Sequence, residues 1–142
     1  AVAGADFIQE TIVEKRDAKE DLYAQLAACV PADVIIASNT SALNIFEVVP
    51  EQLLPQMIIC HWYAPPHVIP LVEVVKSESA PQEYADIAVT MLNNCGKNRS
   101  FSFAEFCHFL TVLSRSANFS TQNQRVLTTV INITPKRRFV NI

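Results

Sequence analysis

Three short apolar runs rich in valine and isoleucine constrain the fold of this chain more than any other feature. They are VIIAS at residues 34–38, QMIICHWY at 56–63 and IPLVEVV at 69–75. A continuous apolar run of strand length is typical of a β-strand that is buried on both faces. Such strands occur in sheets with helices packed on both sides, so the runs predict an α/β fold.

Helical patterns separate these runs from one another. The segment 16–29 has Leu22, Leu26 and Cys29 at helical spacing, with acidic residues in its first turns. Alternation of strand and helix patterns predicts a largely parallel sheet. The other elements expected are a strand over 7–13, a short helix over 41–48, and a helix over 81–96 with Pro81 in its first turn and Gly96 as its C-cap.

One connection cannot follow the parallel pattern. The link APPHVI, at residues 64–69, joins the second and third apolar runs. A crossover between parallel strands needs about a dozen residues or more, usually a helix. The strands at 56–63 and 69–75 are therefore expected to be antiparallel, unless the later one separates at the edge of the sheet.

Glycine is scarce, and this excludes one class of site from the chain. The 142 residues predict one domain, and half of them are hydrophobic, which is enough for a core. Only two are glycines, Gly4 and Gly96. A P-loop or a dinucleotide-binding fingerprint needs at least two glycines within a few residues. The sequence therefore contains no Gly-rich phosphate-binding loop.

Charge divides the chain into two parts. Residues 1–90 hold 13 acidic and 4 basic residues, a balance of −9, whereas residues 91–142 hold 1 acidic and 7 basic residues, a balance of +6. We expect a boundary near Gly96, with a poorly packed tail over 98–142 that contains a helix near 103–115. The basic triplet at 136–138 is too short to indicate a nucleic-acid partner.

Several other classes are not indicated. No apolar run approaches 18 residues, so neither a membrane-spanning helix nor a membrane partner is expected. The chain begins at Ala1 without a secretory signal, which favours an internal or processed fragment and an intracellular location, cytoplasmic or in an organelle matrix. The four cysteines lack metal-ligand spacing and are expected to be free thiols, so no metal site is predicted.

Polar residues follow the predicted strands. Glu14 follows the strand expected over 7–13, and the run 38–41 (SNTS) lies at the end of the strand in the apolar run 34–38. His61 lies at the end of the strand in the apolar run 56–63. In open α/β sheets, ligands bind beyond the carboxyl ends of the strands. Glu73 lies twelve residues after His61 on the returning strand, so its carboxylate can approach the imidazole and form a general base with it. The alternative is a structural histidine at a strand end.

Neighbouring candidates have simpler interpretations. Cys60 precedes His61, but adjacent side chains on a strand point to opposite faces, so a Cys–His nucleophile is not favoured. His67 and Lys97 are expected to be solvated, the first in a loop and the second at a helix end. Cys107 and its neighbour His108 are not expected to bind a metal.

Three segments, in this order and spacing, resemble the NAD-binding domain of the L-3-hydroxyacyl-CoA dehydrogenase family. They are ADFIQETIVE, ASNTSAL and HWYAPPHVIPLVEVV, against the family patterns V-E-x-I-x-E, S-N-T-S-S-L and H-F-x-N-P followed by L-V-E. The variant HWYxPP resembles a divergent branch of the family associated with fungi. The resemblance covers 1–97 and implies a partial Rossmann-like, three-layer α/β domain that lacks its first βαβ unit.

The resemblance also assigns roles to matching residues. His61 and Glu73 fall on the catalytic histidine and its paired glutamate, and Ser41 on the serine that contacts substrate and nicotinamide. Glu14, Lys19 and Asn39 fall on cofactor-binding positions. The family transfers a hydride from a 3-hydroxyacyl-CoA to NAD while the histidine takes the hydroxyl proton, and full-length members are homodimers.

This sequence departs from the family pattern at three places. Ala64 stands where the family has an asparagine after the catalytic histidine. The Gly-rich loop that binds the pyrophosphate of NAD is absent. Beyond Lys97 the family continues into a P-G-F-x-x-N-R motif, whereas this chain reads NRSFSFAEFCHFL, which suggests an altered reading frame or a translated intron.

One principal function and two alternatives follow from these observations. The first is an NAD-dependent 3-hydroxyacyl-CoA dehydrogenase of fatty acid metabolism, of which this chain is part of the cofactor domain and inactive alone. The alternatives are a truncated, non-catalytic remnant, or a relative that acts on another 3-hydroxy acid such as L-gulonate.

Overall fold

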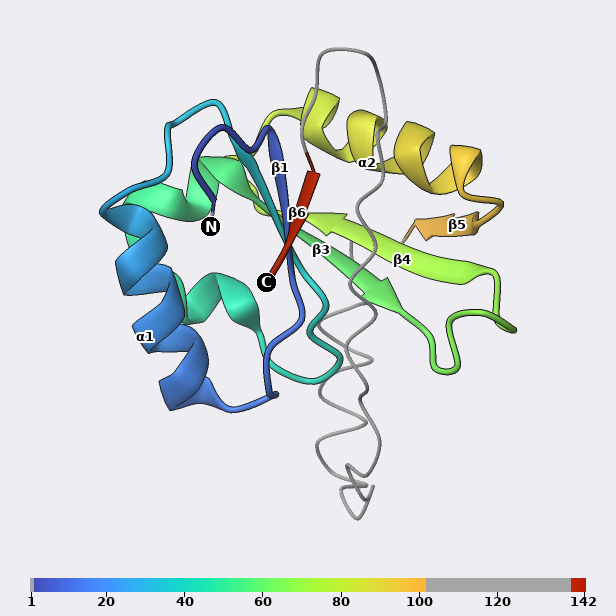
Figure 1. Cartoon of the computed structure of the whole chain (residues 1–142), viewed down its shortest axis with the longest axis horizontal. Helices are drawn as coiled ribbons and strands as arrows, with labels where there is room; N and C mark the ends of the chain where they lie inside the picture. Colours follow the sequence, from blue (N-terminus) through green and yellow to red (C-terminus); the bar gives the residue numbers. More distant parts are fainter. Residues whose placement is uncertain (1, 102–138) are drawn as a thin grey trace.

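A computed structural model of the chain describes residues 2–101 and 139–142. Its centre is a six-stranded sheet with the order β5-β4-β3-β2-β1-β6 (Figure 1). The strands are β1 (Phe7–Glu10), β2 (Ile35–Ser38), β3 (Met57–Trp62), β4 (Leu71–Lys76), β5 (Asn98–Phe101) and β6 (Phe139–Asn141). The helices are α1 (Arg16–Ala27), α2 (Gln82–Asn94) and two 3-10 helices, η1 (Ile45–Glu47) and η2 (Glu51–Gln56).

The strand directions confirm the predicted α/β fold. β1, β2 and β3 are mutually parallel, and β4 returns antiparallel to β3, as the short link between them predicts. The register of that pair sets His61 directly opposite Glu73. Directly opposed residues of an antiparallel pair share one face of the sheet, so the register already brings the predicted dyad together.

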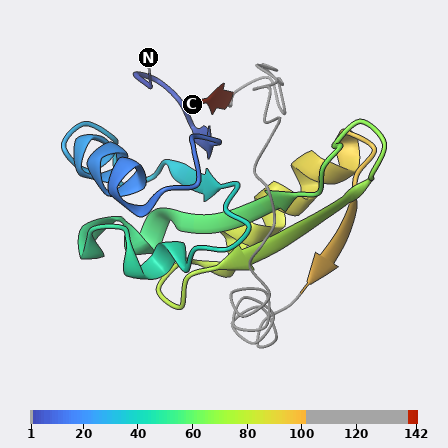
Figure 2. The ribbon, with the colours of Figure 1, turned by 90° about the horizontal axis from the view of Figure 1, so that it is seen from below.

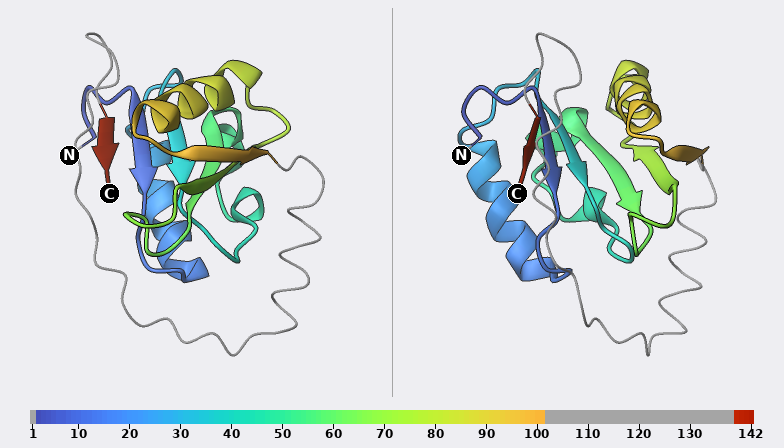
Figure 3. Two further views of the ribbon diagram at one scale, coloured as in Figure 1. Left: turned by 90° about the vertical axis from the view of Figure 1, so that its right-hand side faces the viewer. Right: turned by 45° about the vertical axis from the view of Figure 1, so that its right-hand side comes forward.

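Helices cover the two faces of the sheet with separate cores. On one face, α1 and the 3-10 helices pack on alternate residues of the strands, and we call this group the α1-side core. On the other face, α2 packs on the intervening residues and forms the α2-side core. Figure 3 shows α1 and α2 on opposite sides of the sheet. All four residues of β2 are completely buried, because this strand has a paired strand on each side and a core on each face.

Helix α2 ends as its sequence predicts. Gly96 has a φ of +72°, and its N–H donates to the carbonyl of Asn93, while the N–H of Lys97 donates to that of Leu92. These two bonds define a Schellman motif, which favours glycine at the left-handed position. The motif fixes the direction in which the chain leaves α2, and it therefore fixes the position of Lys97.

Two predicted elements differ from the structure. The strand expected over 7–13 ends at Glu10, and the helix expected over 41–48 is wrong, since only residues 45–47 form a single 3-10 turn. The N–H groups of Ser41 and Ala42 donate to the carboxylate of Glu14, as the unpaired N–H groups of a first helical turn also can. Glu14 thus orients this loop, although residues 41–44 form no helix.

The sheet also includes residues from beyond position 97. β5 pairs in parallel with β4, and β6 pairs in parallel with β1, so each edge strand comes from one end of the predicted tail. Figure 2 shows these two strands at opposite edges. Their pairing counts against an altered reading frame at these two segments, while the domain boundary after Lys97 remains a proposal. The helix expected near 103–115 lies outside the described residues.

Candidate active site

The candidate residues lie together at the carboxyl ends of three parallel strands, and we call this end of the sheet the carboxyl edge. Glu10 ends β1, Ser38 ends β2 and His61 is the penultimate residue of β3. Each follows, two positions later, a strand residue of the α1-side core. Side chains alternate along a strand, so all three lie on the face that α1 covers.

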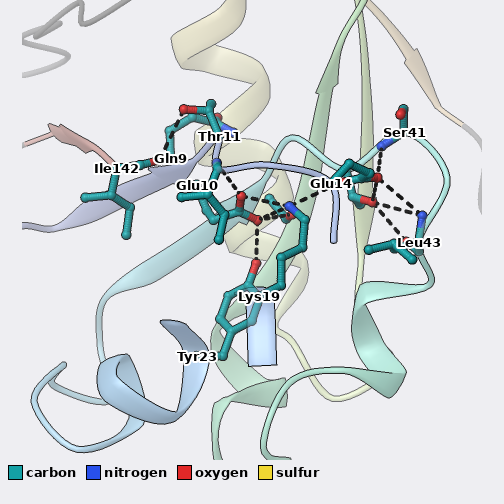
Figure 4. Close-up of polar contacts among 12 residues, drawn as sticks. Gln9, Glu10, Thr11, Glu14, Lys19, Tyr23, Ser41, Leu43 and Ile142 are labelled. Carbon is teal, nitrogen blue, oxygen red and sulfur yellow. Dashed lines mark hydrogen bonds and ion pairs between the residues drawn. The ribbon is translucent and has the colours of Figure 1, made fainter. Parts of the chain in front are cut away.

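Glu10 is a fully buried carboxylate whose oxygens accept several hydrogen bonds. The hydroxyls of Ser38 and Tyr23 donate to Oε2 at 2.6 and 2.8 Å, and the backbone N–H of Ile12 donates to Oε1 at 2.8 Å. The ammonium of Lys19 lies 2.8 Å from both oxygens. A buried charge is stable only where it is paired and hydrogen-bonded, and Glu10 meets both conditions (Figure 4).

Lys19 joins Glu10 to Glu14. Its side chain is 1% exposed, and its Nζ also lies 3.2 Å from Oε2 of Glu14. The resemblance assigns Lys19 to cofactor binding. In this structure its ammonium is enclosed by two carboxylates of its own chain, so the geometry favours an indirect effect on the site through Glu14.

Glu14 organises the loop that follows β2. Its Oε1 accepts bonds from the hydroxyl of Thr40 at 2.6 Å and from the N–H groups of Ser41 and Ala42 at 2.9 and 3.1 Å. Burial raises the pKa of Glu14, but the Thr40 hydroxyl, the Lys19 ammonium and these N–H groups together outweigh it and hold the pKa below its ordinary value. Glu14 is therefore held as a carboxylate.

His61 and Glu73 form a second pair of interacting ionisable side chains at the carboxyl ends of the strands. Nδ1 of His61 lies 3.1 Å from Oε2 of Glu73, and the two side chains are 15% and 14% exposed. Within the described part of the chain, Nε2 of His61 has no hydrogen-bond partner. The arrangement leaves one ring nitrogen of a carboxylate-held imidazole available for proton transfer.

Two aromatic residues follow the histidine: Trp62 ends β3, and Tyr63 begins the connection to β4. The ring of Tyr63 lies against that of His61, with centroids 4.7 Å apart. Partial burial and the negative charge of Glu73 raise the pKa of Tyr63, which keeps its hydroxyl protonated. The side-chain oxygen of Asn39 accepts the backbone N–H of Trp62 at 2.8 Å, so Asn39 joins the end of β2 to the end of β3.

Other sequence-based expectations have mixed outcomes. Cys60 faces the α2-side core, where burial raises its pKa to about 12, so it does not act with His61. His67 is exposed, as expected. The expectation that Lys97 is solvated is wrong, because its ammonium donates to carbonyls of Pro66 and Ile69. Cys107 and His108 lie outside the described residues.

Sequence reasoning missed Glu10 and Tyr23. The available signal was a charged residue at the end of a strand whose other residues are mostly apolar, since an unpaired carboxylate is very costly to bury there. Tyr23 lies four residues after Lys19, so the two share one face of α1, but only the folded structure shows that this face meets Glu10.

Among the described residues, no three histidine, cysteine or acidic side chains could hold a metal ion. No helix of the described part is long and apolar enough to cross a membrane.

Curated proteins with similar sequences are dehydrogenases. The chain is 38% identical over 99 residues to an L-carnitine dehydrogenase of Nocardiopsis dassonvillei, which covers 69% of this chain and 30% of that protein. It is also 38% identical over 89 residues to the 5-formyl-3-hydroxy-2-methylpyridine 4-carboxylate 5-dehydrogenase of Mesorhizobium japonicum, covering 61% of this chain and 29% of that one. The chain thus spans about a third or less of the length of these relatives.

Solved structures show the same fold. A 5-formyl-3-hydroxy-2-methylpyridine 4-carboxylic acid 5-dehydrogenase, described as an NAD⁺-dependent dismutase, matches with a TM-score of 0.64 and 27% identity, over 81% of this chain and 39% of that one. The 3-hydroxybutyryl-CoA dehydrogenase of Escherichia coli matches with a TM-score of 0.64 and 26% identity, over 72% and 22%.

The family profile described as "3-hydroxyacyl-CoA dehydrogenase, NAD binding domain" matches residues 1–99, more than half of the chain. This match agrees with the α/β sheet, and the cofactor of the family is NAD. On this evidence the chain belongs to the 3-hydroxyacyl-CoA dehydrogenase family, through its NAD-binding domain.

Proposed function

We propose that the protein to which this chain belongs is an NAD-dependent dehydrogenase that oxidises the 3-hydroxyl of a hydroxy acid or its thioester, with His61 as the general base. The observation that carries the proposal is the His61–Glu73 pair, 3.1 Å apart at a partly exposed strand edge. An ionised carboxylate only accepts hydrogen bonds, so Glu73 keeps the ring proton on Nδ1. Nε2 then holds the lone pair that takes the proton of the substrate hydroxyl.

Glu14, Ser41 and Asn39 fit the part of NAD that carries the nicotinamide and its ribose. When bound, NAD supplies the acceptor for the hydride that leaves carbon 3 of the substrate. Glu14 is a carboxylate suited to ribose hydroxyls, and the hydroxyl of Ser41 has no hydrogen-bond partner in the described part of the chain. Asn39 borders the same edge through its bond to β3. The pyrophosphate end has no such fit, since the sequence holds no Gly-rich loop.

The relatives favour a small hydroxy acid as the substrate. Several of them are L-carnitine dehydrogenases, with identities between 32% and 44% over the matched segments. L-Carnitine is a free 3-hydroxy acid, not a CoA thioester. We therefore favour a free 3-hydroxy acid as the substrate over a hydroxyacyl-CoA of fatty acid metabolism. L-Gulonate is also a free 3-hydroxy acid.

A chimera tests the general base. Residues 1–99 replace the matching segment of an L-carnitine dehydrogenase, and NADH formation is followed with L-carnitine, L-gulonate and 3-hydroxybutyryl-CoA. We expect His61→Ala to lower kcat by about 10²–10⁴-fold, the range of a positioned general base. The matched control is His67→Ala, which removes an exposed loop imidazole and is expected to keep most of the activity.

Near-full activity of the His61→Ala chimera would overturn the general-base assignment and leave a structural histidine. An inactive chimera that is folded would favour the non-catalytic alternative.

The unmodified chain offers a second test. We expect isothermal titration of the chain with NAD to give weak binding or none, because the donors for the pyrophosphate are not in this sequence. A micromolar dissociation constant would contradict this expectation. Glu14 and Ser41 would then have to contribute more to cofactor binding than their positions suggest.

A further inference from the structure

The segment 63–70 connects the two members of the dyad. It leaves β3 two residues after His61 and enters β4 two residues before Glu73. A change in the course of this loop therefore acts on both strand ends that hold the pair. Its placement matters to the proposed chemistry, since Nε2 of His61 has to meet a substrate at this edge.

The loop contributes little packing of its own. None of its residues is buried, and Val68 is 67% exposed. Its internal backbone bonds run from the N–H groups of Val68 and Ile69 to the carbonyl of Pro65, each at 3.0 Å. Segments with few buried apolar contacts lie at the low-stability end of a fold, so another group must hold this loop against the sheet.

Lys97 supplies that group from a distant part of the sequence. Its ammonium donates to the carbonyl of Pro66 and, at 3.2 Å, to the carbonyl of Ile69. It also lies 5.6 Å from the ring centroid of Trp62, within the range of a cation–π interaction. The Schellman motif at the end of α2 fixes the backbone from which this side chain extends.

We propose that Lys97 is a positioning residue of the candidate active site, which clamps the 63–70 loop to β3 beside His61. Its charge satisfies two loop carbonyls that would otherwise be hydrogen-bonded to water. Its contact with Trp62 anchors it to the strand residue that follows His61, on the opposite face of β3. The consequence for catalysis rests on the proposed function. The clamp itself does not, because it can be measured on the chain without cofactor or substrate.

Trp62 is the only tryptophan of the sequence, so the chain carries its own reporter. The experiment compares the chain with Lys97→Met, Lys97→Arg and Lys76→Met. Lys76 is a matched control, because its ammonium also donates to two backbone carbonyls, those of Ser77 and Ala80, but at the opposite end of β4. Tryptophan emission, acrylamide quenching and amide hydrogen exchange are measured, with the urea midpoint as a check on folding.

For Lys97→Met we expect emission at longer wavelength, stronger quenching, and exchange of the Val68 and Ile69 amides that is faster by about tenfold or more, because bonds from a charged donor are lost. Lys97→Arg is expected to restore the behaviour of the unmodified chain, and Lys76→Met to leave all three signals unchanged.

The proposal fails if Lys97→Met keeps the unmodified emission and exchange, or if Lys76→Met produces the same changes. It also fails if Lys97→Arg behaves like Lys97→Met, because the positive charge is then not the cause. A missing NAD-dependent activity would instead count against the proposed function and leave this result intact.

Discussion

Two pairs of oppositely charged or chargeable side chains lie on one face of the sheet, and they differ in how completely they are enclosed. Glu10 and Lys19 are 0% and 1% exposed, whereas His61 and Glu73 are 15% and 14% exposed. Glu10 accepts bonds from four donor groups, and Lys19 contacts two carboxylates. In the second pair, one ring nitrogen of His61 has no partner in the described part of the chain.

The difference suits the first pair to a structural role and the second to the chemical role that we propose for it. A buried pair with all its bonding capacity in use cannot react without unfolding part of the core, but it fixes the strand ends around it. A partly exposed pair contributes little to stability, and its remaining nitrogen can exchange a proton with a substrate. We infer that the first pair holds the edge in shape and that the second performs the chemistry there.

The largest expected effect follows from breaking the buried pair. Lys19→Met leaves Glu10 as an uncompensated charge in the core, and removal of one partner from a buried pair costs about 3–5 kcal/mol of unfolding free energy. Urea denaturation measures the loss. The matched control is Arg16→Met, which removes an exposed partner of Glu20 and is expected to cost less than about 1 kcal/mol. Equal losses in both variants would contradict the distinction between buried and exposed pairs.

A smaller effect is expected when only one donor to Glu10 is removed. Tyr23→Phe keeps the ring in the α1-side core and deletes the hydroxyl that lies 2.8 Å from Oε2 of Glu10. Hydrogen bonds to charged groups contribute about 1.5–3 kcal/mol, and we expect a loss of that size in urea denaturation. The control is Tyr84→Phe, which removes the hydroxyl of a partly buried tyrosine on α2, away from Glu10. If the two tyrosine variants are equally stable, the Glu10 cluster is less tightly bonded than its distances indicate.

The partly exposed pair of His61 and Glu73 is expected to have a still smaller effect on stability. Glu73→Gln keeps the size of the side chain and an oxygen that can accept a bond from Nδ1 of His61, so the free energy of unfolding is expected to change by less than about 1 kcal/mol. Urea denaturation of this variant sharpens the comparison. A loss as large as that of Lys19→Met would assign the His61 pair to structure and weaken its proposed role in catalysis.

The smallest effect is a change in acid sensitivity. The pKa of Glu14 is held below its ordinary value of 4.5 in the folded chain, so its contribution to stability is present above about pH 4.5 and is lost as the pH falls further. Glu14→Gln removes this contribution. Stability measured between neutral pH and pH 3 is expected to fall less steeply below pH 4.5 in the variant. Parallel curves for the two proteins would show that the pKa of Glu14 is the same in the folded and unfolded states.

Local patterns were sufficient to predict much of this fold. The apolar runs predicted strands at β2, β3 and β4, and the six-residue link predicted that β3 and β4 are antiparallel. Gly96 predicted the end of α2. In each case the determining interactions lie within a few residues of one another, so the sequence contains them in readable form.

Features that depend on distant partners were not predictable. The position of the loop at 41–43 depends on Glu14, about 27 residues away, which accepts its N–H groups. Lys97 looks like a solvated helix end until the 63–70 loop is placed beside it. In both cases one side chain satisfies backbone groups of a remote segment, and no periodicity in the sequence reports such a contact.

The pairing of β6 with β1 has a consequence for the order of folding. The hydroxyl of Thr11 donates to the side-chain oxygen of Asn141 and to the carbonyl of Ile142. These partners are separated from Thr11 by 130 and 131 positions in the sequence. Closing so long a stretch of chain costs more entropy than closing any β1–β2 or β3–β4 contact, and β6 offers only three residues in return. Non-local contacts of this kind slow folding when the transition state needs them. We therefore expect β1 to β4 to assemble first and β6 to dock afterwards, so that the outer edge of β1 is the last part of the described sheet to gain protection from exchange.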